Sequence, residues 1–275
     1  MSTQTPKSIL FISATGGIAL ATLKRCLAAP PGSLSITVLA RSPTRLQSLL
    51  SPTELASPSL RIIQGNAHSV SDLVPVLTPN PSAPTNNPSS DSSSLPSPTK
   101  KLVDIILTSI GGKPDLKKLS VDDPHVCEKG MSALLEALSS VSTSVSKRPY
   151  IIAISAAGAS TIAREYPLAL YPVHALLLKG AIKDKRAMER TLAESEGGSK
   201  WTVVRPSMLT DKPGVGVGKV RVSLEDLRGK RLEGEVVVGY TVSRLDVGDW
   251  IFERLVIAEE SGKGRYEGRA VVLSY

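Results

Sequence analysis

Strand-like apolar runs alternate with helical patterns along most of this 275-residue chain, and this alternation constrains the fold most strongly. The patterns predict strands near residues 8–12, 34–40, 60–64, 102–108, 150–155, 201–205, 236–242 and 270–274. They predict helices near residues 17–29, 69–77, 122–140, 175–195 and 246–260. Aromatic residues make up only 4% of the chain, so aliphatic side chains fill the core, as in parallel sheets covered by helices on both faces. We therefore predict an α/β fold with a doubly wound, mostly parallel sheet of the Rossmann type.

Residues 78–101 interrupt this alternation. They are mostly Pro, Ser, Asn and Thr, carry almost no apolar side chains and end in two lysines. Such a composition cannot bury enough surface to order itself, so we predict a disordered surface insertion. Because the strand pattern resumes at residue 102, we expect residues 1–275 to form a single domain around this insertion.

Charge, hydropathy and cysteine usage exclude several function classes. The formal net charge is +8, but the basic residues are scattered without a nucleic-acid-binding motif, so we expect no nucleic-acid partner. No apolar run approaches the roughly 20 residues that span a bilayer, and the N-terminus has no signal-peptide pattern. We therefore expect no membrane attachment and a cytoplasmic location. Cys26 and Cys127 lie in predicted helices without metal or redox spacing, which indicates free core thiols and no metal site.

The turn after the first predicted strand points to a phosphate-binding site. It reads Ser13-Ala14-Thr15-Gly16-Gly17-Ile18-Ala19 and passes directly into a helix. Gly16 leaves room for a pyrophosphate against the backbone, and the helix N-terminus directs unpaired N–H groups at that charge. Ser13 departs from the motif, because a glycine usually stands there. We expect residues 13–18 to bind a dinucleotide; the alternative is a tight strand-to-helix turn without a ligand.

Two arginines follow the second predicted strand, at the place that selects between NAD and NADP. An acidic residue there would bind the ribose 2′-hydroxyl of NAD, whereas an arginine accommodates the 2′-phosphate of NADP. Arg41 occupies this place, Arg45 follows one helical turn later, and neither Asp nor Glu lies between them. The sequence therefore predicts NADP(H) as the cofactor. Two exposed arginines without a ligand are the alternative.

Five stretches of the chain carry a resemblance to a known family. They are Ile12–Gly17 (ISATGG), Val38–Arg45 (VLARSPTR), Gln64–Asn66 (QGN), Trp201–Pro206 (WTVVRP) and Ser243–Val247 (SRLDV). With these stretches the chain resembles the atypical short-chain dehydrogenase/reductases. Within them it is similar to the NAD(P)H-binding, NmrA-like proteins that include flavin and biliverdin-IXβ reductases. The resemblance covers nearly the whole chain outside the insertion.

The resemblance assigns further residues to the cofactor. It implies that Gly65-Asn66-Ala67 lies beside the adenine, with Asn66 in place of the family's usual Asp. It implies that Ser109-Ile110-Gly111-Gly112 covers the ribose and pyrophosphate, and that Pro206 and Ser207 flank the nicotinamide. Each position has a structural alternative, because glycine and proline after strands also form ordinary loop turns.

The usual hydride-transfer residues of the larger superfamily are a Tyr, a Lys four residues later and a Ser. The tyrosine donates a proton, and the lysine lowers the pKa of the tyrosine. This chain has no Tyr four residues before a Lys; Ala181 stands four residues before Lys185. Our catalytic candidates are Ser155, as a donor to a carbonyl oxygen or a partner of the nicotinamide amide, and Lys185, as a ribose contact. The alternatives are a serine that caps backbone and an exposed helical lysine.

These features together predict an NADPH-dependent reductase of a small hydrophobic or aromatic acceptor, such as a quinone, flavin or conjugated carbonyl, acting in secondary metabolism. Such acceptors take hydride without a strong protein acid, because solvent can supply the proton. Two alternatives stay open: a non-catalytic NADP(H) sensor of the NmrA-like type, and a redox-silent isomerase or cyclase. Residues 208–234 should form a small region that covers the substrate, but they carry no recognition motif. The substrate and the oligomeric state therefore stay open.

Overall fold

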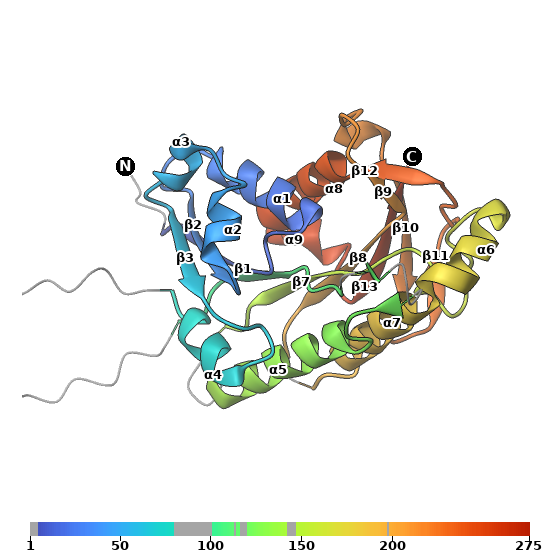
Figure 1. Ribbon diagram of the computed structural model, residues 1–275, viewed down its shortest axis with the longest axis horizontal. Coiled ribbons are helices and arrows are strands. Elements are labelled where there is room, and N and C mark those ends of the chain that lie inside the picture. The colour runs from blue at the N-terminus through green and yellow to red at the C-terminus, as the bar shows by residue number, and fades with distance from the viewer. Residues whose placement is uncertain (1–4, 80–100, 113, 116–119, 142–146, 197) are drawn as a thin grey trace, which may run out of the picture.

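A nine-stranded sheet forms the centre of the computed structural model, which describes residues 5–79, 101–112, 114–115, 120–141, 147–196 and 198–275 (Figure 1). Its strands are β1 (Lys7–Ile12), β2 (Leu34–Ala40), β3 (Leu60–Gln64), β4 (Ile105–Thr108), β7 (Tyr150–Ile154), β8 (Trp201–Pro206), β10 (Arg221–Asp226), β11 (Arg231–Glu233) and β13 (Arg269–Ser274). The strand order is β11-β10-β13-β8-β7-β4-β1-β2-β3. Neighbouring strands from β3 to β13 pair in parallel, whereas β10 pairs antiparallel with both β13 and β11.

Helices cover both faces of this sheet (Figure 1). Helices α1 (Gly17–Leu27) and α8 (Arg244–Ile251) pack together on one face, and α5 (Val126–Val141) and α7 (Lys179–Ala193) pack together on the other. The shorter helices are α2 (Pro43–Gln47), α3 (Pro52–Leu55), α4 (Val70–Leu73), α6 (Tyr171–Val173) and α9 (Glu260–Gly264). Two small two-stranded sheets join β5 (Pro114–Asp115) to β6 (Ser120–Val121) and β9 (Met208–Thr210) to β12 (Thr241–Ser243).

The two faces of the sheet bury two separate aliphatic cores. Alternate residues of β1 enter different cores, with Ile9 and Phe11 on the α1/α8 side and Leu10 and Ile12 on the α5/α7 side. Since every residue of β7 is buried, this strand lies at the centre of the domain. The direction of the strand order reverses between β1 and β4, and crevices at such a reversal are the usual ligand sites of doubly wound sheets.

The predicted fold class is confirmed, with β2 and β3 at the predicted bounds, but several elements differ. Of the strand predicted at 236–242, only the end forms a strand. That strand is β12, which pairs with β9 outside the main sheet. The sequence reading missed β10 and β11, whose alternate positions are polar. The helix predicted at 175–195 begins as a π-helix (His174–Leu178) before α7. Most of the predicted insertion, residues 80–100, lies outside the described residues.

Both cysteines are buried and free, as predicted. Burial raises the pKa of Cys26 to about 12 and the pKa of Cys127 to about 11. Neither thiol therefore ionises near neutral pH. In the described part of the chain, we find no helix that is both long enough and apolar enough to cross a membrane.

Candidate functional site

The turn between β1 and α1 holds its serine in a conformation that is usual for glycine. Ser13 has a φ of 66°, the left-handed conformation that glycine adopts most easily. Gly16, in contrast, has an ordinary φ of −77°. A Cβ on Gly16 would come no nearer than 3.4 Å to the Ser109 Oγ, which is ordinary contact among the described atoms. The described fold itself therefore does not require glycine at position 16.

The positive end of the α1 helix dipole lies at this turn, and no side chain of the helix's own first turn neutralises it. Its first turn contains no acidic residue, and the described residues provide no side-chain cap at Gly16. Ile18 and Ala14 are buried in the core, so each can offer a ligand only its backbone N–H group. Free N–H groups and the helix dipole together favour an anion at this point.

A cavity of about 310 Å³ adjoins the turn outside the carboxyl ends of β1 to β4. It brings together most of the residues that the sequence assigned to the cofactor. The predicted residues in its lining are Ser13, Ala14, Thr15, Arg41, Arg45, Gly65, Asn66, Ala67, Ile110 and Gly111. Ser109 lies next to Gly16 at the same end of the sheet. Arg41 and Arg45 are both exposed at the cavity, where a 2′-phosphate can reach them.

The corner after β3 is fixed by the Asp72 carboxylate. Asp72 accepts a hydrogen bond of 2.8 Å from the backbone N–H of Asn66, which with bonds from Ser69 and Ser71 holds the pKa of Asp72 below its usual range. A Cβ on Gly65 would lie 2.6 Å from the Leu39 Cδ1, so close packing requires glycine there. This corner presents the Asn66 segment to the cavity.

Sequence reasoning did not assign to the cofactor five residues of this cavity lining, which are Leu39, Ala40, Ser42, His68 and Val126. The His68 Nε2 lies 2.9 Å from the carbonyl oxygen of Val126, the first residue of α5, and thereby joins the corner after β3 to that helix. The contact spans 58 residues of sequence, so only the position of His68 two residues after Asn66 offered a local signal.

A second cavity, of about 350 Å³, lies outside the carboxyl ends of β7 and β8. It contains the predicted residues Ser155, Lys185, Pro206 and Ser207. Its other walls are mostly apolar or aromatic and include Ala156, Ala157, Tyr166, Leu170, Leu178, Ala181, Ile182, Met208, Leu209 and Tyr240. Cavities of this size and lining suit a small, largely hydrophobic molecule.

Lys185 connects the two cavities. Its ammonium donates hydrogen bonds of 2.7 Å to the carbonyl oxygens of both Ile110 and Ile154. Ile110 lines the first cavity and Lys185 lines the second, so this hydrogen bond joins the walls of the two cavities. The neighbouring Asp184 accepts hydrogen bonds from the N–H groups of Cys127 and Glu128, which caps the start of α5.

The Ser155 hydroxyl is already committed to a buried carboxylate. It donates a hydrogen bond of 2.5 Å to the Oε1 of Glu189, on α7. The Ser155 oxygen therefore faces the second cavity as a hydrogen-bond acceptor. In contrast, the Ser207 Oγ is buried and has no hydrogen-bond partner among the described residues, although it belongs to the same cavity lining.

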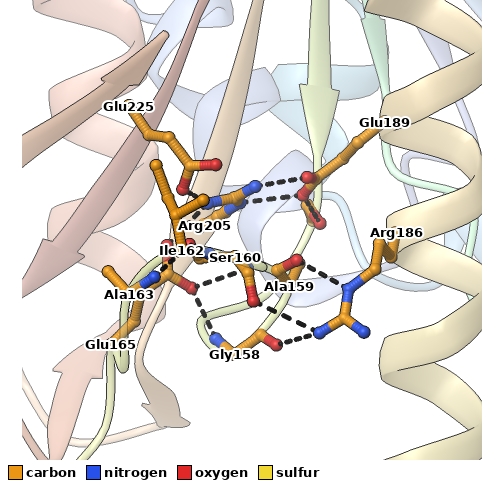
Figure 2. Close-up of polar contacts among 11 residues, drawn as sticks. Gly158, Ala159, Ser160, Ile162, Ala163, Glu165, Arg186, Glu189, Arg205 and Glu225 are labelled. Carbon is orange, nitrogen blue, oxygen red and sulfur yellow. Dashed lines mark hydrogen bonds and ion pairs between the residues drawn. The ribbon is translucent and has the colours of Figure 1, made fainter. Parts of the chain in front are cut away.

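Glu189 belongs to a buried ionic cluster around Arg205, shown in Figure 2. Arg205, inside strand β8, donates to both oxygens of Glu189, and its Nη1 lies 2.6 Å from both Glu165 and Glu225. Burial alone would lower the pKa of Arg205, but the three carboxylates raise it. Burial raises the pKa of Glu165 against the opposing attraction of Arg205. Through Glu189, this cluster holds the Ser155 hydroxyl in place.

The same cluster holds the loop after β7. Glu165 accepts a hydrogen bond from the backbone N–H of Gly158, and Arg186 on α7 donates to the carbonyl oxygens of Gly158 and Ala159 (Figure 2). The loop that follows Ser155 is thus fixed to α7 and to β8. Sequence reasoning quoted Arg205 only as part of a motif and missed its partners. An arginine within an otherwise apolar strand was the available signal that buried acids must surround it.

Comparisons with known proteins identify a family and relatives of this chain. Residues 99–256 match the family described as NAD(P)H-binding. Reductase pytE of Aspergillus terreus is 32% identical over 294 residues, which cover 100% of both chains. Oxidase pynE of Aspergillus niger is 32% identical over 292 residues, which cover 97% of this chain and 98% of the relative.

Solved structures support the same fold. A short-chain dehydrogenase/reductase from Veillonella parvula DSM 2008, in complex with NADP, matches with a TM-score of 0.64 and 20% identity. The match covers 98% of this chain and 94% of that one. The resemblance to NAD(P)H-binding proteins that was drawn from the sequence is therefore confirmed, and the chain belongs to the family described as NAD(P)H-binding.

Proposed function

We propose that this chain is an NADPH-dependent reductase of a small hydrophobic or aromatic acceptor, such as a quinone, a flavin or a conjugated carbonyl compound. The observation that carries the proposal is the hydrogen bond from Lys185, in the wall of the second cavity, to the carbonyl oxygen of Ile110, in the wall of the first. One cavity has the phosphate turn and the exposed arginines, and the other is apolar and lies beside it. Such a pair accommodates a dinucleotide with its reactive end next to an acceptor.

The residues of the first cavity fit a bound NADP(H). The space beside Gly16, which a Cβ would fill, suits a pyrophosphate at the N-terminus of α1. Arg41 and Arg45 would hold the 2′-phosphate, and Asn66 would lie at the adenine. Lys185, already fixed by two carbonyl oxygens, would present its remaining N–H to the ribose. When bound, the reduced nicotinamide supplies hydride to the acceptor.

The second cavity offers hydrogen bonds but no strong acid at the position of the superfamily's tyrosine. Ala181 stands one helical turn before Lys185 and lines the cavity in place of a phenol. Since Ser155 donates to Glu189, we assign to Ser207 the hydrogen bond to an acceptor oxygen as negative charge develops there, which requires its buried Oγ to turn toward the cavity. Water then supplies the proton. This arrangement favours acceptors whose reduced form is a stabilised anion, such as quinones, flavins and enones.

The Ser155 oxygen has a different role in this proposal. Held as an acceptor by Glu189, it is suited to bind an N–H of the nicotinamide amide or a hydroxyl of the substrate. Of the two roles considered from the sequence, the hydrogen bond to Glu189 favours orientation of the nicotinamide over donation to a carbonyl.

The test is NADPH oxidation with a panel that contains a naphthoquinone, FMN and a conjugated enone. We expect oxidation that depends on the acceptor. Ser207→Ala should lower kcat/KM by roughly 10- to 100-fold, the effect of one lost hydrogen bond to a developing charge. Ser140→Ala, on α5 and away from both cavities, is the matched control.

The other functions considered from the sequence give different results in this assay. A sensor would bind NADPH but oxidise it with none of the acceptors. An isomerase or cyclase would form product without net NADPH consumption. A folded protein that binds neither NADPH nor NADH would contradict the proposal itself.

A further inference from the structure

Arg244 lies across the start of α1, although it comes from the far end of the chain. It is the first residue of α8, and its side chain covers Gly17, the first residue of α1. A Cβ on Gly17 would come 2.2 Å from the Arg244 Cδ and 2.8 Å from its Nε, closer than real Cβ contacts. Glycine at position 17 therefore leaves room for the Arg244 side chain to lie against the N-terminus of α1.

The Arg244 guanidinium now pairs with a carboxylate that is almost wholly in water. Its Nη1 lies 2.8 Å from the Asp211 Oδ1, and the Asp211 side chain is 89% exposed. Exposed ion pairs of this kind contribute little, because water competes for both charges. The pair is thus easily exchanged for a better-placed anion.

Two positive features meet at this point of the molecule. The N-terminus of α1 carries free N–H groups and the positive end of the helix dipole. Arg244 adds a full positive charge beside it and also belongs to the lining of the second cavity. An anion placed between the phosphate turn and the second cavity would interact with both. On a dinucleotide bound across the two cavities, that anion is the phosphate nearer the nicotinamide.

We propose that Arg244 binds the nicotinamide-side phosphate of NADP(H), and that Asp211 is a competing anion that holds the guanidinium until the cofactor enters. The inference rests on the proposed cofactor site and adds to it a residue from α8. It also assigns a reason for glycine at position 17, which is room for the Arg244 side chain.

The experiment compares NADPH with adenosine 2′,5′-bisphosphate, which keeps the adenosine and 2′-phosphate but lacks the nicotinamide-side phosphate. Both ligands are titrated calorimetrically into wild type, Arg244→Ala, Arg244→Lys and Asp211→Asn, and the Tm of each variant checks its fold. Arg254→Ala is the matched control, because Arg254 is an exposed arginine in the turn of helix that follows α8.

We expect Arg244→Ala to weaken NADPH roughly 10-fold or more and to leave the bisphosphate within about twofold. Arg244→Lys should restore part of the NADPH affinity, because it keeps the charge without the forked geometry. Asp211→Asn should tighten NADPH by up to about fivefold, since it removes a weak exposed competitor. Arg254→Ala should change neither affinity.

Other outcomes overturn the inference in distinguishable ways. Unchanged NADPH affinity in folded Arg244→Ala overturns it and leaves the proposed function standing. Equal loss for both ligands also overturns it, because the residue then acts through the folding of the whole site. A raised KM for the acceptor with an unchanged Kd for NADPH assigns Arg244 to the acceptor instead. If the wild type binds neither ligand, the proposed function and this inference fail together.

Discussion

Replacing Arg205 with Met should cost more stability than any other single change at the site. The Arg205 side chain is 1% exposed and is the shared partner of Glu165, Glu189 and Glu225 at 2.5–3.0 Å. Its loss leaves three buried carboxylates without their cation. Breaking a buried ion pair costs about 3–5 kcal/mol, because the partner stays buried and uncompensated. Domains of this kind have a total stability of about 5–15 kcal/mol, so the variant should be close to unfolding.

The sign of the pH dependence separates this explanation from a simple packing defect. Burial already raises the folded-state pKa of Glu165, and without the opposing attraction of Arg205 that pKa rises further above its unfolded value. Acids with a raised folded-state pKa stabilise the fold fully below their unfolded pKa, and that contribution is lost as pH rises through the folded pKa. Urea unfolding of Arg205→Met should therefore show a deficit that grows from pH 5 to pH 8.

Exposed Arg254 provides the control, since Arg254→Met removes the same charge from the surface and should change stability by less than about 0.5 kcal/mol. A deficit for Arg205→Met below about 1 kcal/mol, or one that shrinks as pH rises, would refute the buried-charge reasoning.

Two further predictions concern cofactor choice and the thiols. Arg41→Ala with Arg45→Ala should weaken NADPH by about 10-fold or more but leave NADH nearly unchanged, and added salt should shrink the wild-type preference, because exposed charges are screened. Equal wild-type affinity for NADPH and NADH at low salt would contradict the arginine assignment. Cys26 and Cys127 should react with a thiol reagent at pH 8 only on unfolding. Their raised pKa values of about 12 and 11 also mean that stability falls as pH rises above the ordinary thiol pKa, which alkaline unfolding curves would show. Fast native labelling would show that the thiols are accessible.

Local sequence patterns predicted those helices and strands whose own residues carry the hydrophobic pattern and the flanking turn residues. Strands β2 and β3 are short apolar runs between turn residues, and their predicted bounds match. Strand β10 was missed because most of its side chains are polar and because its partner β13 lies far along the chain. The start of α5 was placed too early, because its N-terminal N–H groups are capped by Asp184, 57 residues further along the chain.

The candidate site divides in the same way. Residues 13–15 of the turn after β1, the arginine pair and Asn66 line one cavity, because each directly follows a parallel strand and those strand ends share one edge of the sheet. The ionic cluster could not be read locally, since Arg205 and its three acids come from four separate segments. Of the two roles that the sequence left open for Ser155, the hydrogen bond to Glu189 argues against donation to a carbonyl oxygen, and the position of Glu189 could not be predicted locally.

The most direct test of the central claim is NADPH binding by Gly16→Val. In the described structure, a Cβ at position 16 makes only ordinary contacts and the φ of −77° is accessible to any residue, so the variant should fold with a Tm near that of the wild type. The branched side chain would occupy the space assigned to the pyrophosphate. Fluorescence titration should show NADPH affinity reduced more than roughly 10-fold, above about 1.4 kcal/mol. A folded Gly16→Val protein that binds NADPH as tightly as the wild type would contradict a cofactor site at this turn.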